Sequence, residues 1–456
     1  MKDFDLVIVG TGSGNSIPAE LDDWNIALVE RDVFGGTCLN RGCIPSKMFI
    51  YAADVALHVR ESERFGVRST LDGVDWPDIV DRVFGRIDPI AAGGERYRIE
   101  DCDNITVFQG SGSFVDHKVL EVETESGVDQ LRSDKFILGA GARPFVPDVP
   151  GLAEAGFHTS DSIMRVREVP ERLVVIGGGY IATELGHVFE AFGSSVTMIN
   201  RSGRLLRSED DDISQRYTEL AGQRFDLVLD AAIERVERNG DVTTVHVVQD
   251  GTARAIEADA LLVATGRIPN SDQLNVEATG VKCDPAGRVI THDDHQTDVE
   301  GIWAFGDLSN HFQLKHVANA EAKMVFHNVA NPDDVRLKDE FAVPHAVFGN
   351  PQVASVGMTE RDAAAEGVPF ITASKDYGTT AYGWAMEDRT SFVKLVAHAQ
   401  TRKLLGAHII GPQASTLIQS LIQGMRFGQT VDEMAHDQMW IHPALSEVVE
   451  NALLDL

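Results

Sequence analysis

The stretch LVVIGGGYIATELGHVFEAFGSSVTMIN, residues 173–200, decides the fold class of this chain. An apolar run stops at glycines, a longer segment follows, and a second apolar run ends the stretch. This order predicts a strand, a glycine turn, a helix and a parallel strand. The opening of the chain repeats the plan, because FDLVIV at 4–9 precedes GTGSGNS and IALVE follows at 26–30. The repetition predicts an α/β fold with two Rossmann-like dinucleotide-binding domains.

Further landmarks divide the chain. KFILGAGARP at 135–144 is echoed by LLVATGRIPN at 261–270, so each repeat is followed by a strand that ends in Gly-x-Arg. The proline-rich segment 142–151 and the polar segment 331–340 indicate boundaries. Beyond them, FVKLVAHA and KLLGAHIIG predict antiparallel strands, and STLIQSLIQGMRFG predicts an amphipathic helix. We expect residues 1–150 to form the first part of one dinucleotide-binding domain, 151–270 the second such domain, 271–338 a segment that completes the first, and 339–456 a C-terminal α+β domain.

The charge balance limits the partners. The chain of 456 residues carries 70 acidic and 40 basic residues, for a net charge of −30. Such a charge repels nucleic acids and anionic membrane surfaces, so neither is expected as a partner. No apolar run approaches the ~20 residues of a membrane span, and the start MKDFDLVIVG lacks the basic region of a signal peptide. We therefore expect a cytoplasmic protein, in which a close cysteine pair is catalytic or metal-binding rather than structural.

The first glycine turn has the spacing of a dinucleotide site. Gly10 permits a tight turn, and Gly12 lets the backbone approach a pyrophosphate at the start of the helix expected there. Glu30 ends the second strand, where a carboxylate accepts a hydrogen bond from a ribose hydroxyl. Asn15 replaces the third glycine of the pattern, so a turn without a ligand is the alternative. We predict that Gly10, Gly12, Gly14, Asn15 and Glu30 bind a dinucleotide.

The second turn fits the pattern better, because Gly177, Gly179 and Ala182 occupy its three positions. Its second strand ends at Asn200, whereas an acid there would accept the 2′-hydroxyl of NAD. Arginines suit the 2′-phosphate of NADP. A solvated basic turn is the alternative, although clustered arginines are unusual in so acidic a chain. The arginines concerned are Arg201, Arg204 and Arg207, and we predict NADPH as the coenzyme.

GGTCLNRGCIPSK, residues 35–47, holds two of the four cysteines, Cys38 and Cys43. With two dinucleotide sites in one chain, the pair indicates a path on which a pyridine nucleotide reduces a flavin and the flavin reduces a disulfide. No other Cys or His lies near enough in sequence to complete a zinc site, so we expect no metal. Five residues of ideal helix separate Cα atoms by ~7.5 Å, too far for a disulfide. The pair must span a helix start or a distorted turn, and a helix N-terminus lowers a thiol pKa; two inert buried thiols are the alternative.

The motif GGTCLNRGCIPSK resembles the redox motif of the pyridine nucleotide-disulfide oxidoreductases of the glutathione reductase and dihydrolipoamide dehydrogenase type. The resemblance covers essentially the whole chain. It implies FAD and NADPH as cofactors, and a homodimer in which residues 339–456 form the dimerisation domain and the active site is shared between subunits. By this likeness Cys38 attacks a small-molecule disulfide substrate, and Cys43 lies against the flavin as the charge-transfer thiolate. Lys47 and Glu184 form a pair near flavin N5.

The same likeness assigns further residues to the cofactors. Tyr180 gates the nicotinamide pocket, and Asp307, in AFGD, binds the ribityl chain of the flavin. Arg201 and Arg207 match the positions that hold the 2′-phosphate in NADPH-specific members. The remaining cofactor-binding positions that it implies are Gly36, Thr37, Gly141 and Gly266.

WIHPALSEVVEN, residues 440–451, provides a candidate acid–base group. Pro443 suits the first turn of a helix, which leaves His442 just outside the helix and places Glu447 about one turn inward. A carboxylate in that position fixes the imidazole tautomer and raises its basicity. The spacing resembles the C-terminal acid–base motif of the family, in which the histidine faces the disulfide of the other subunit. The apolar stripe from Leu417 would belong to the same dimerisation domain, and a buried core helix is the alternative.

Several stretches are most similar to the mycothione reductases, an actinobacterial branch of the family: GTGSGNS, CIPSKMFIYAADVA, RVFGRIDPIA, YGWAMED and MWIHPAL. This resemblance implies that the substrate is the disulfide of mycothiol, a cysteine–glucosamine–inositol thiol. Trp384, Met386 and Glu387 either line the sugar site or pack at an interface. Two alternatives stay open. One is an NAD-dependent dihydrolipoamide dehydrogenase or another low-molecular-weight disulfide reductase, and the other is a flavoprotein that serves only in binding or assembly.

Overall fold

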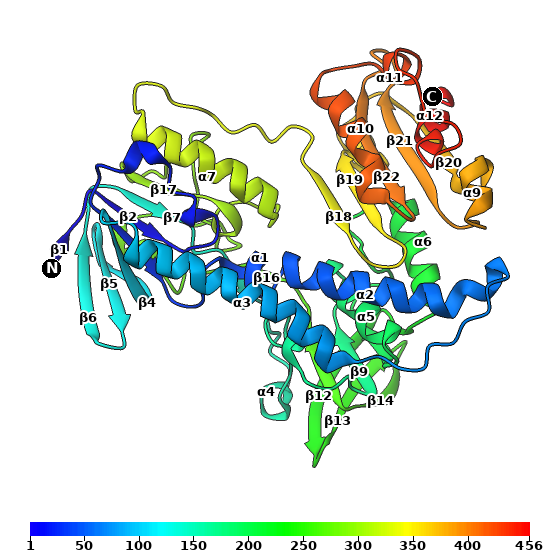
Figure 1. The fold of residues 1–456 in the computed structure, drawn as a ribbon, viewed down its shortest axis with the longest axis horizontal. Coiled ribbons are helices and arrows are strands. Elements are labelled where there is room, and N and C mark those ends of the chain that lie inside the picture. Colours follow the sequence, from blue (N-terminus) through cyan, green and yellow to red (C-terminus); the bar gives the residue numbers. More distant parts are fainter. The chain divides into compact units, whose positions relative to one another are not determined.

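The computed structural model describes residues 1–456 and divides into two compact units, each made of helices packed on sheets (Figure 1). The architecture is the predicted α/β fold, with a mixed sheet in unit 1, a parallel sheet in unit 2 and a C-terminal α+β domain. Unit 1 contains residues 1–45, 80–145 and 266–339, and unit 2 contains residues 46–79, 146–265 and 340–456.

Unit 1 is built on an eight-stranded sheet in the order β1-β6-β5-β4-β3-β2-β7-β17. The strands from β4 to β17 are parallel, and short apolar runs such as LVIV and FIL are fully buried in them. β5 and β6 extend the sheet as an antiparallel hairpin. The strands are β1 (Lys2–Asp3), β2 (Leu6–Val9), β3 (Ile26–Glu30), β4 (Ile105–Asp116), β5 (Val119–Thr124), β6 (Gly127–Arg132), β7 (Phe136–Leu138) and β17 (Ile302–Ala304).

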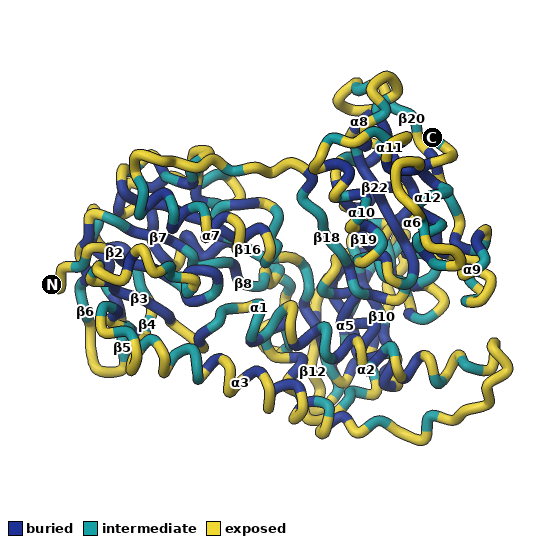
Figure 2. Tube along the Cα trace, turned by 45° about the horizontal axis from the view of Figure 1, so that its top comes forward, coloured by how far each residue is buried: buried dark blue, intermediate teal, exposed yellow.

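Apolar clusters cover both faces of this sheet. On one face, Phe326 of α7 (Lys315–Ala330) packs in a cluster with Ile8. On the other, Phe114 and Leu120 pack in a cluster with Val7. Figure 2 shows that buried residues follow the strands. The carboxyl ends of the parallel strands share one edge of the sheet, which is where nucleotide-binding turns occur in α/β proteins.

The two segments that end in Gly-x-Arg pair with each other. β8 (Ala142–Pro144) and β16 (Arg267–Pro269) form an antiparallel ribbon in unit 1. Next to the ribbon, the N–H of Phe145 donates to the carbonyl of Gly266 at 2.8 Å. The chain therefore leaves unit 1 and returns to it at the same ribbon.

Unit 2 contains the second nucleotide-binding sheet, four parallel strands in the order β11-β10-β9-β15. Helix α5 (Tyr180–Ala191) begins directly after the glycine turn. Gly186 lets α5 pack closely on β10, because a Cβ there would lie 2.2 Å from the side chain of Met198. An antiparallel sheet, β12-β13-β14, shares a core with these strands. The strands are β9 (Arg172–Ile176), β10 (Ser195–Ile199), β11 (Asp226–Val228), β12 (Ala231–Asn239), β13 (Val242–Gln249), β14 (Thr252–Ala258) and β15 (Ala260–Val263).

The C-terminal part of unit 2 is a five-stranded antiparallel sheet in the order β18-β19-β22-β21-β20. β21 and β22 are the two strands predicted from FVKLVAHA and KLLGAHIIG. On α10 (Ala414–Arg426), Ile418, Leu421 and Met425 are buried in the core of this domain. Most of the apolar stripe is therefore a core face of this C-terminal domain. The strands are β18 (Pro344–Val347), β19 (Val353–Gly357), β20 (Phe370–Asp376), β21 (Phe392–His398) and β22 (Leu404–Ile410).

The other helices complete the layers. None of them combines the length and the apolar character that a bilayer crossing requires. They are α1 (Gly36–Asn40), α2 (Cys43–Glu61), α3 (Trp76–Glu100), α4 (Leu152–Ala155), α6 (Asp211–Ala221), α8 (Glu360–Ala365), α9 (Ala381–Ala385), α11 (Val431–His436) and α12 (Glu447–Leu454).

The first glycine turn lacks the helix that the sequence predicted after it. Only two 3₁₀ turns, Ser13–Asn15 and Ala19–Leu21, separate β2 from β3. Pro18 stands between them with an extended ψ of 160°, and it has no N–H to give to a helix. A proline also steers the residue before it away from helical angles. The prediction of a helix was therefore wrong at this position.

Candidate functional site

The two cysteines of the redox motif lie where one helix ends and the next begins. Cys38 is in the short helix α1, and Cys43 is the first residue of α2. Both are free thiols, and their side chains are in hydrogen-bonding contact. The pair thus spans a helix start, which is the local geometry that its spacing requires.

The redox loop packs against the first glycine turn. A Cβ on Gly36 would lie 2.8 Å from the Cα of Gly12, so the two backbones are in contact. The N–H of Gly35 donates to the Thr11 hydroxyl at 3.1 Å. Gly35 and Gly36 have φ values of +98° and +66°, which favour glycine. Glycine at these positions therefore allows Cys38 to approach the edge of the parallel sheet.

The environment raises the pKa of Cys38. The hydrogen bond with Cys43 is the largest cause, burial adds to it, and the charge of Lys315 lowers the pKa in part. Cys43, not Cys38, is the thiol at a helix N-terminus, where a lowered pKa is expected of a redox thiol. Two adjacent sulfurs resist ionising together, so this geometry favours one thiolate shared by the pair.

The first glycine turn has the features of a phosphate cradle. Gly10 has a φ of +96°, and a Cβ on it would lie 2.4 Å from the carbonyl oxygen of Gly139. Gly12 is more open, since the nearest atom to a Cβ there would be 3.9 Å away. Glu30 is buried, and its Oε2 accepts from the N–H and the hydroxyl of Thr11 at 2.9 and 2.6 Å. Glu30 thus orders the turn from the end of β3.

Two basic residues near this turn were missed from the sequence. Nε and Nη2 of Arg98, on α3, donate to the side-chain oxygen and the carbonyl of Asn15 at 2.8 and 2.7 Å. Nζ of Lys315, at the start of α7, donates to the Ser13 hydroxyl at 2.9 Å. Neither residue belongs to a motif. The one local signal was Asn15, whose polar side chain in place of the third glycine needs a hydrogen-bond partner.

Asp307 lies in a 3₁₀ turn, Gly306–Leu308, directly after β17. The N–H of Gly306 donates to the carboxylate of Glu321 at 2.7 Å, which holds the turn on α7. Burial raises the pKa of Asp307, and Arg267, whose Nε lies 3.8 Å from the carboxylate, partly offsets that rise. The backbone of Gly141 and Gly266 is open, because a Cβ on either would meet no atom within 4 Å.

The second glycine turn repeats the first with a helix attached. Gly177 has a φ of +132°, and a Cβ on it would lie 2.2 Å from the carbonyl oxygen of Ala264. Gly179 precedes α5 and has open space where a Cβ would be. Ala182 is fully buried, whereas Tyr180 is 43% exposed at the first position of α5. Arg201, Arg204 and Arg207 are exposed in the segment after β10.

The structure contains the expected pair of Lys47 and Glu184. Nζ of Lys47 donates to both carboxylate oxygens at 2.8 and 2.7 Å. The N–H of Phe348 donates to the same carboxylate at 2.9 Å, and Nζ lies 4.6 Å from the centre of the Phe348 ring. Glu184 is almost fully buried. The pair fixes Lys47 one helical turn after Cys43 on α2.

His442 and Glu447 also form the expected pair. Nδ1 of His442 lies 2.6 Å from Oε1 of Glu447, and the hydrogen bond with His442 holds the pKa of Glu447 below its usual range. The local backbone differs from the prediction, because α12 begins at Glu447 and not near Pro443. Residues 442–446 form a turn in which the Glu447 carboxylate accepts the N–H of Ala444 at 3.2 Å. The carboxylate, on the first residue of α12, thus caps the turn that precedes the helix.

The residues present fit the cofactors that the sequence implied. Each nucleotide-binding sheet ends in a glycine turn with open backbone at its second glycine. A thiol pair packs against the first of these turns. Fold and site together define a nucleotide-dependent dithiol–disulfide oxidoreductase.

The comparison with known families agrees with this class. Residues 4–322 match the pyridine nucleotide-disulphide oxidoreductase family, and residues 343–453 match its dimerisation domain. The chain belongs to this family. It is an FAD-containing, NADPH-dependent disulfide oxidoreductase, as the sequence predicted, and the dimerisation domain supports the expected homodimer.

Individual relatives cover the whole length of the chain. A mycothione reductase of Mycobacterium tuberculosis is 45% identical over 465 aligned positions, which cover 100% of both chains. A mercuric reductase of Staphylococcus aureus is 34% identical and covers 95% of this chain and 79% of its own. Among solved structures, an HOCl-induced flavoprotein disulfide reductase of Escherichia coli has a TM-score of 0.87 and 26% identity, with 100% of this chain and 99% of that chain covered.

Proposed function

We propose that this chain reduces mycothione, the disulfide of mycothiol, with electrons from NADPH. The observation that carries the substrate assignment is the 45% identity with a mycothione reductase over the full length of both chains. We propose further that residues 1–150 and 271–338 form the FAD domain, 151–270 the NADPH domain and 339–456 the dimerisation domain of a cytoplasmic enzyme.

The thiol chemistry belongs to Cys38 and Cys43. When bound, FAD and NADPH supply the two electrons that open the disulfide between these cysteines. The Cys38 thiolate attacks one sulfur of the substrate, which breaks the substrate S–S bond and forms a mixed disulfide. Cys43 then attacks the sulfur of Cys38, so the internal disulfide forms again and the second substrate thiol leaves. Each departing thiolate takes up one proton.

His442 of a second copy is the proposed proton donor. Its side chain is 73% exposed, and Glu447 holds Nδ1, so Nε2 is left to face another molecule. Glu447 orients the imidazole so that Nε2 can give a proton to the leaving thiolate. The exposure of His442 therefore suits a proton donor that acts at the cysteines of a partner subunit.

The proposed cofactor contacts lie along the two turns. FAD would lie along the first turn, the redox loop and the turn after β17, and NADPH along the second turn and its arginines. The proposed FAD contacts are Gly10, Gly12, Gly14, Asn15, Glu30, Gly36, Thr37, Lys47, Gly141 and Asp307, and the proposed NADPH contacts are Gly177, Gly179, Tyr180, Ala182, Arg201, Arg207 and Gly266.

A sugar-binding role for α9 is part of the proposal. Trp384 is 65% exposed, while its Nε1 donates to the carbonyl of Gly378 at 2.8 Å. This hydrogen bond holds an exposed ring in place. Met386 packs partly against the domain core, and Glu387 pairs with Arg389 at 3.7 Å. We expect Trp384→Ala to raise the KM for mycothione and to leave the reduction of a small aromatic disulfide unchanged.

A substrate panel tests the assignment. Purified enzyme with NADPH is offered mycothione, glutathione disulfide, trypanothione and lipoamide, and kcat/KM is compared. We expect mycothione to be preferred. A preference for any other disulfide would reject the narrow assignment and leave the oxidoreductase class intact. Faster flavin reduction by NADH than by NADPH would favour the dihydrolipoamide dehydrogenase alternative.

A further inference from the structure

The segment between β10 and α6, residues 200–207, carries the arginines proposed for the coenzyme phosphate, and we call it the coenzyme loop. Asn200 orders it by donating to the carbonyl of Arg204 at 2.9 Å. The N–H of Leu206 donates to the carbonyl of Gly178, inside the second glycine turn, at 2.8 Å. The loop and the glycine turn are thus one backbone unit, and the position of the loop sets where a 2′-phosphate can bind.

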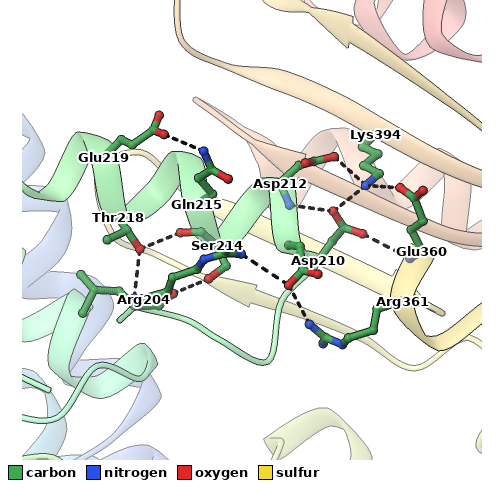
Figure 3. Close-up of polar contacts among 12 residues, drawn as sticks. Arg204, Asp210, Asp212, Ser214, Gln215, Thr218, Glu219, Glu360, Arg361 and Lys394 are labelled. Carbon is green, nitrogen blue, oxygen red and sulfur yellow. Dashed lines mark hydrogen bonds and ion pairs between the residues drawn. The ribbon is translucent and has the colours of Figure 1, made fainter. Parts of the chain in front are cut away.

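Two buried acids come directly after the coenzyme loop. Glu209 and Asp210 are 3% and 1% exposed, and both bind side chains of the C-terminal sheet. Glu209 lies 2.7 Å from Nε2 of His345 on β18 and accepts from the Ser355 hydroxyl on β19 at 2.6 Å. Asp210 accepts from Nζ of Lys394 on β21 at 2.8 Å (Figure 3). The end of the loop is therefore held by a different sheet from the one that begins it.

Lys394 is the centre of this arrangement. It is almost fully buried, and its Nζ also lies 2.6 Å from Asp212 and 2.7 Å from Glu360 (Figure 3). Burial alone would lower the pKa of Lys394, but hydrogen bonds with the three carboxylates raise it. The lysine stays charged, and an uncharged replacement would leave Asp210 buried without its counter-charge.

Asp210 also begins helix α6. Its Oδ1 accepts the N–H of Asp212 at 3.1 Å, so the same carboxylate caps the helix and binds Lys394. The Asp211 carboxylate contacts Arg204 at 3.6 Å and accepts from Arg361 on α8 at 2.8 Å. A shift of Asp210 would therefore move the helix start and the coenzyme loop together.

We propose that Lys394 and Asp210 are positioning residues for coenzyme selection, because their ion pair holds the end of the coenzyme loop on the C-terminal sheet and so places its arginines for the 2′-phosphate. The proposal rests on the proposed use of NADPH. It makes the preference for NADPH depend on a lysine that lies outside the nucleotide-binding sheet and does not touch the coenzyme.

The test compares two variants of the full-length holoenzyme. Lys394→Met removes the counter-charge of Asp210, whereas Glu360→Gln removes another carboxylate partner of Lys394 that is not attached to the coenzyme loop. Calorimetric titration with 2′,5′-ADP and with 5′-AMP gives two dissociation constants. The ratio of the constant for 5′-AMP to the constant for 2′,5′-ADP measures how much the 2′-phosphate strengthens binding. We expect the ratio to fall about tenfold in Lys394→Met and to stay unchanged in Glu360→Gln.

Steady-state kinetics separate positioning from a general loss of structure. In Lys394→Met we expect the KM for NADPH to rise, while kcat at saturating NADPH and the KM for the disulfide are kept. An unchanged nucleotide ratio in Lys394→Met overturns the proposal. If that variant does not fold, Asp210→Asn decides, because asparagine keeps the helix cap and loses the charge; the ratio should again fall, and an unchanged ratio again overturns the proposal. A wild-type protein that binds both nucleotides equally would contradict the use of NADPH itself, which is a separate failure.

Discussion

The two glycine turns share a backbone plan and differ in the element that comes after the turn. Gly10 and Gly177 both have positive φ values, and a Cβ on either would overlap a carbonyl oxygen at the end of the neighbouring strand. Helix α5 starts directly after the second turn, whereas only 3₁₀ turns come after the first. Both turns thus bring the ends of two neighbouring strands into close contact. A helix follows the turn only in the second repeat.

If both turns bind a phosphate as proposed, they would bring positive charge to it in two ways. The N-terminus of α5 presents backbone N–H groups and the positive end of a helix dipole. The first turn lacks that dipole, and it has instead Arg98 bound to Asn15 and Lys315 bound to Ser13. We expect the full charges of these two side chains to take the place of the partial charge of a helix end.

The largest effect should come from the two cysteines of the redox loop, which packs against the first turn and has no counterpart at the second. We expect Cys38→Ser and Cys43→Ser each to lower NADPH-dependent disulfide reduction by about 10³-fold or more, because neither serine can form the internal disulfide. FAD should stay bound, as its absorbance would show. Cys102→Ser is the matched control in unit 1 and should keep full activity; if it loses as much as the other two, the assignment of the redox pair is wrong.

Alanine at the first glycine of each turn separates the two cofactors. Each change forces a Cβ against a carbonyl oxygen at a positive φ, which costs about 1–3 kcal/mol in strain alone. Gly10→Ala should give protein depleted in flavin, and Gly177→Ala should keep flavin but raise the KM for NADPH by about 100-fold. Gly93→Ala on α3, where a Cβ meets nothing within 4 Å, is the control. Equal loss of flavin in both turn variants would refute the proposal that the first turn binds FAD and the second binds NADPH.

Removing the side-chain charge at the first turn should have a smaller effect. Arg98→Met takes away two hydrogen bonds to Asn15 and a positive charge, so FAD should bind about tenfold more weakly to the apoprotein, equivalent to about 1.4 kcal/mol. Fluorescence titration of apoprotein with FAD measures this. Arg96→Met, on an exposed position of the same helix, should leave the affinity unchanged. An unaltered affinity in Arg98→Met would show that the turn needs no substitute for a helix dipole.

The smallest effect concerns the Glu209–His345 pair beyond the second repeat. Burial alone would raise the pKa of Glu209, but His345 and Ser355 hold it below its ordinary 4.5. Burial alone would lower the pKa of His345, but Glu209 raises it above its ordinary 6.5. The Glu209 contribution to stability is therefore present above pH 4.5 and lost as the pH falls through the lowered pKa. The His345 contribution is present below pH 6.5 and lost as the pH rises through the raised pKa.

Between about pH 6 and about pH 9, the Tm of the wild type should thus fall by about 2 °C more than that of His345→Gln. Differential scanning calorimetry at several pH values measures the difference. Parallel profiles would mean that His345 does not gain a proton from its contact with Glu209.

The sequence predicted the features whose cause is local. Apolar runs before glycines gave the parallel strands, and the spacing of Cys38 and Cys43 required the helix start that the structure shows. The pair of Lys47 and Glu184, 137 positions apart, was available only through the resemblance to a family. The missing first helix had a local cause, Pro18, which the glycine pattern outweighed in the prediction.

Other features have no local signal at all. Lys394 and Asp210 are 184 positions apart, and in a chain with 70 acidic residues no pattern distinguishes one aspartate. The raised pKa of Cys38 depends mainly on its hydrogen bond with Cys43 and on burial, and Lys315, which the fold brings near, offsets part of the rise. Such contacts arise only when distant segments pack together.

The ribbon of β8 and β16 has a consequence for how the protein can be altered. Phe145 and Gly266, which flank residues 146–265, are hydrogen-bonded to each other. A segment whose first and last residues lie side by side is topologically an insertion. The path of the rest of the chain therefore stays the same when the inserted segment is replaced. Residues 146–265 can therefore be exchanged as a cassette with both splice points at this one joint, provided that the counterpart keeps the acids that bind Lys47, His345 and Lys394 outside it.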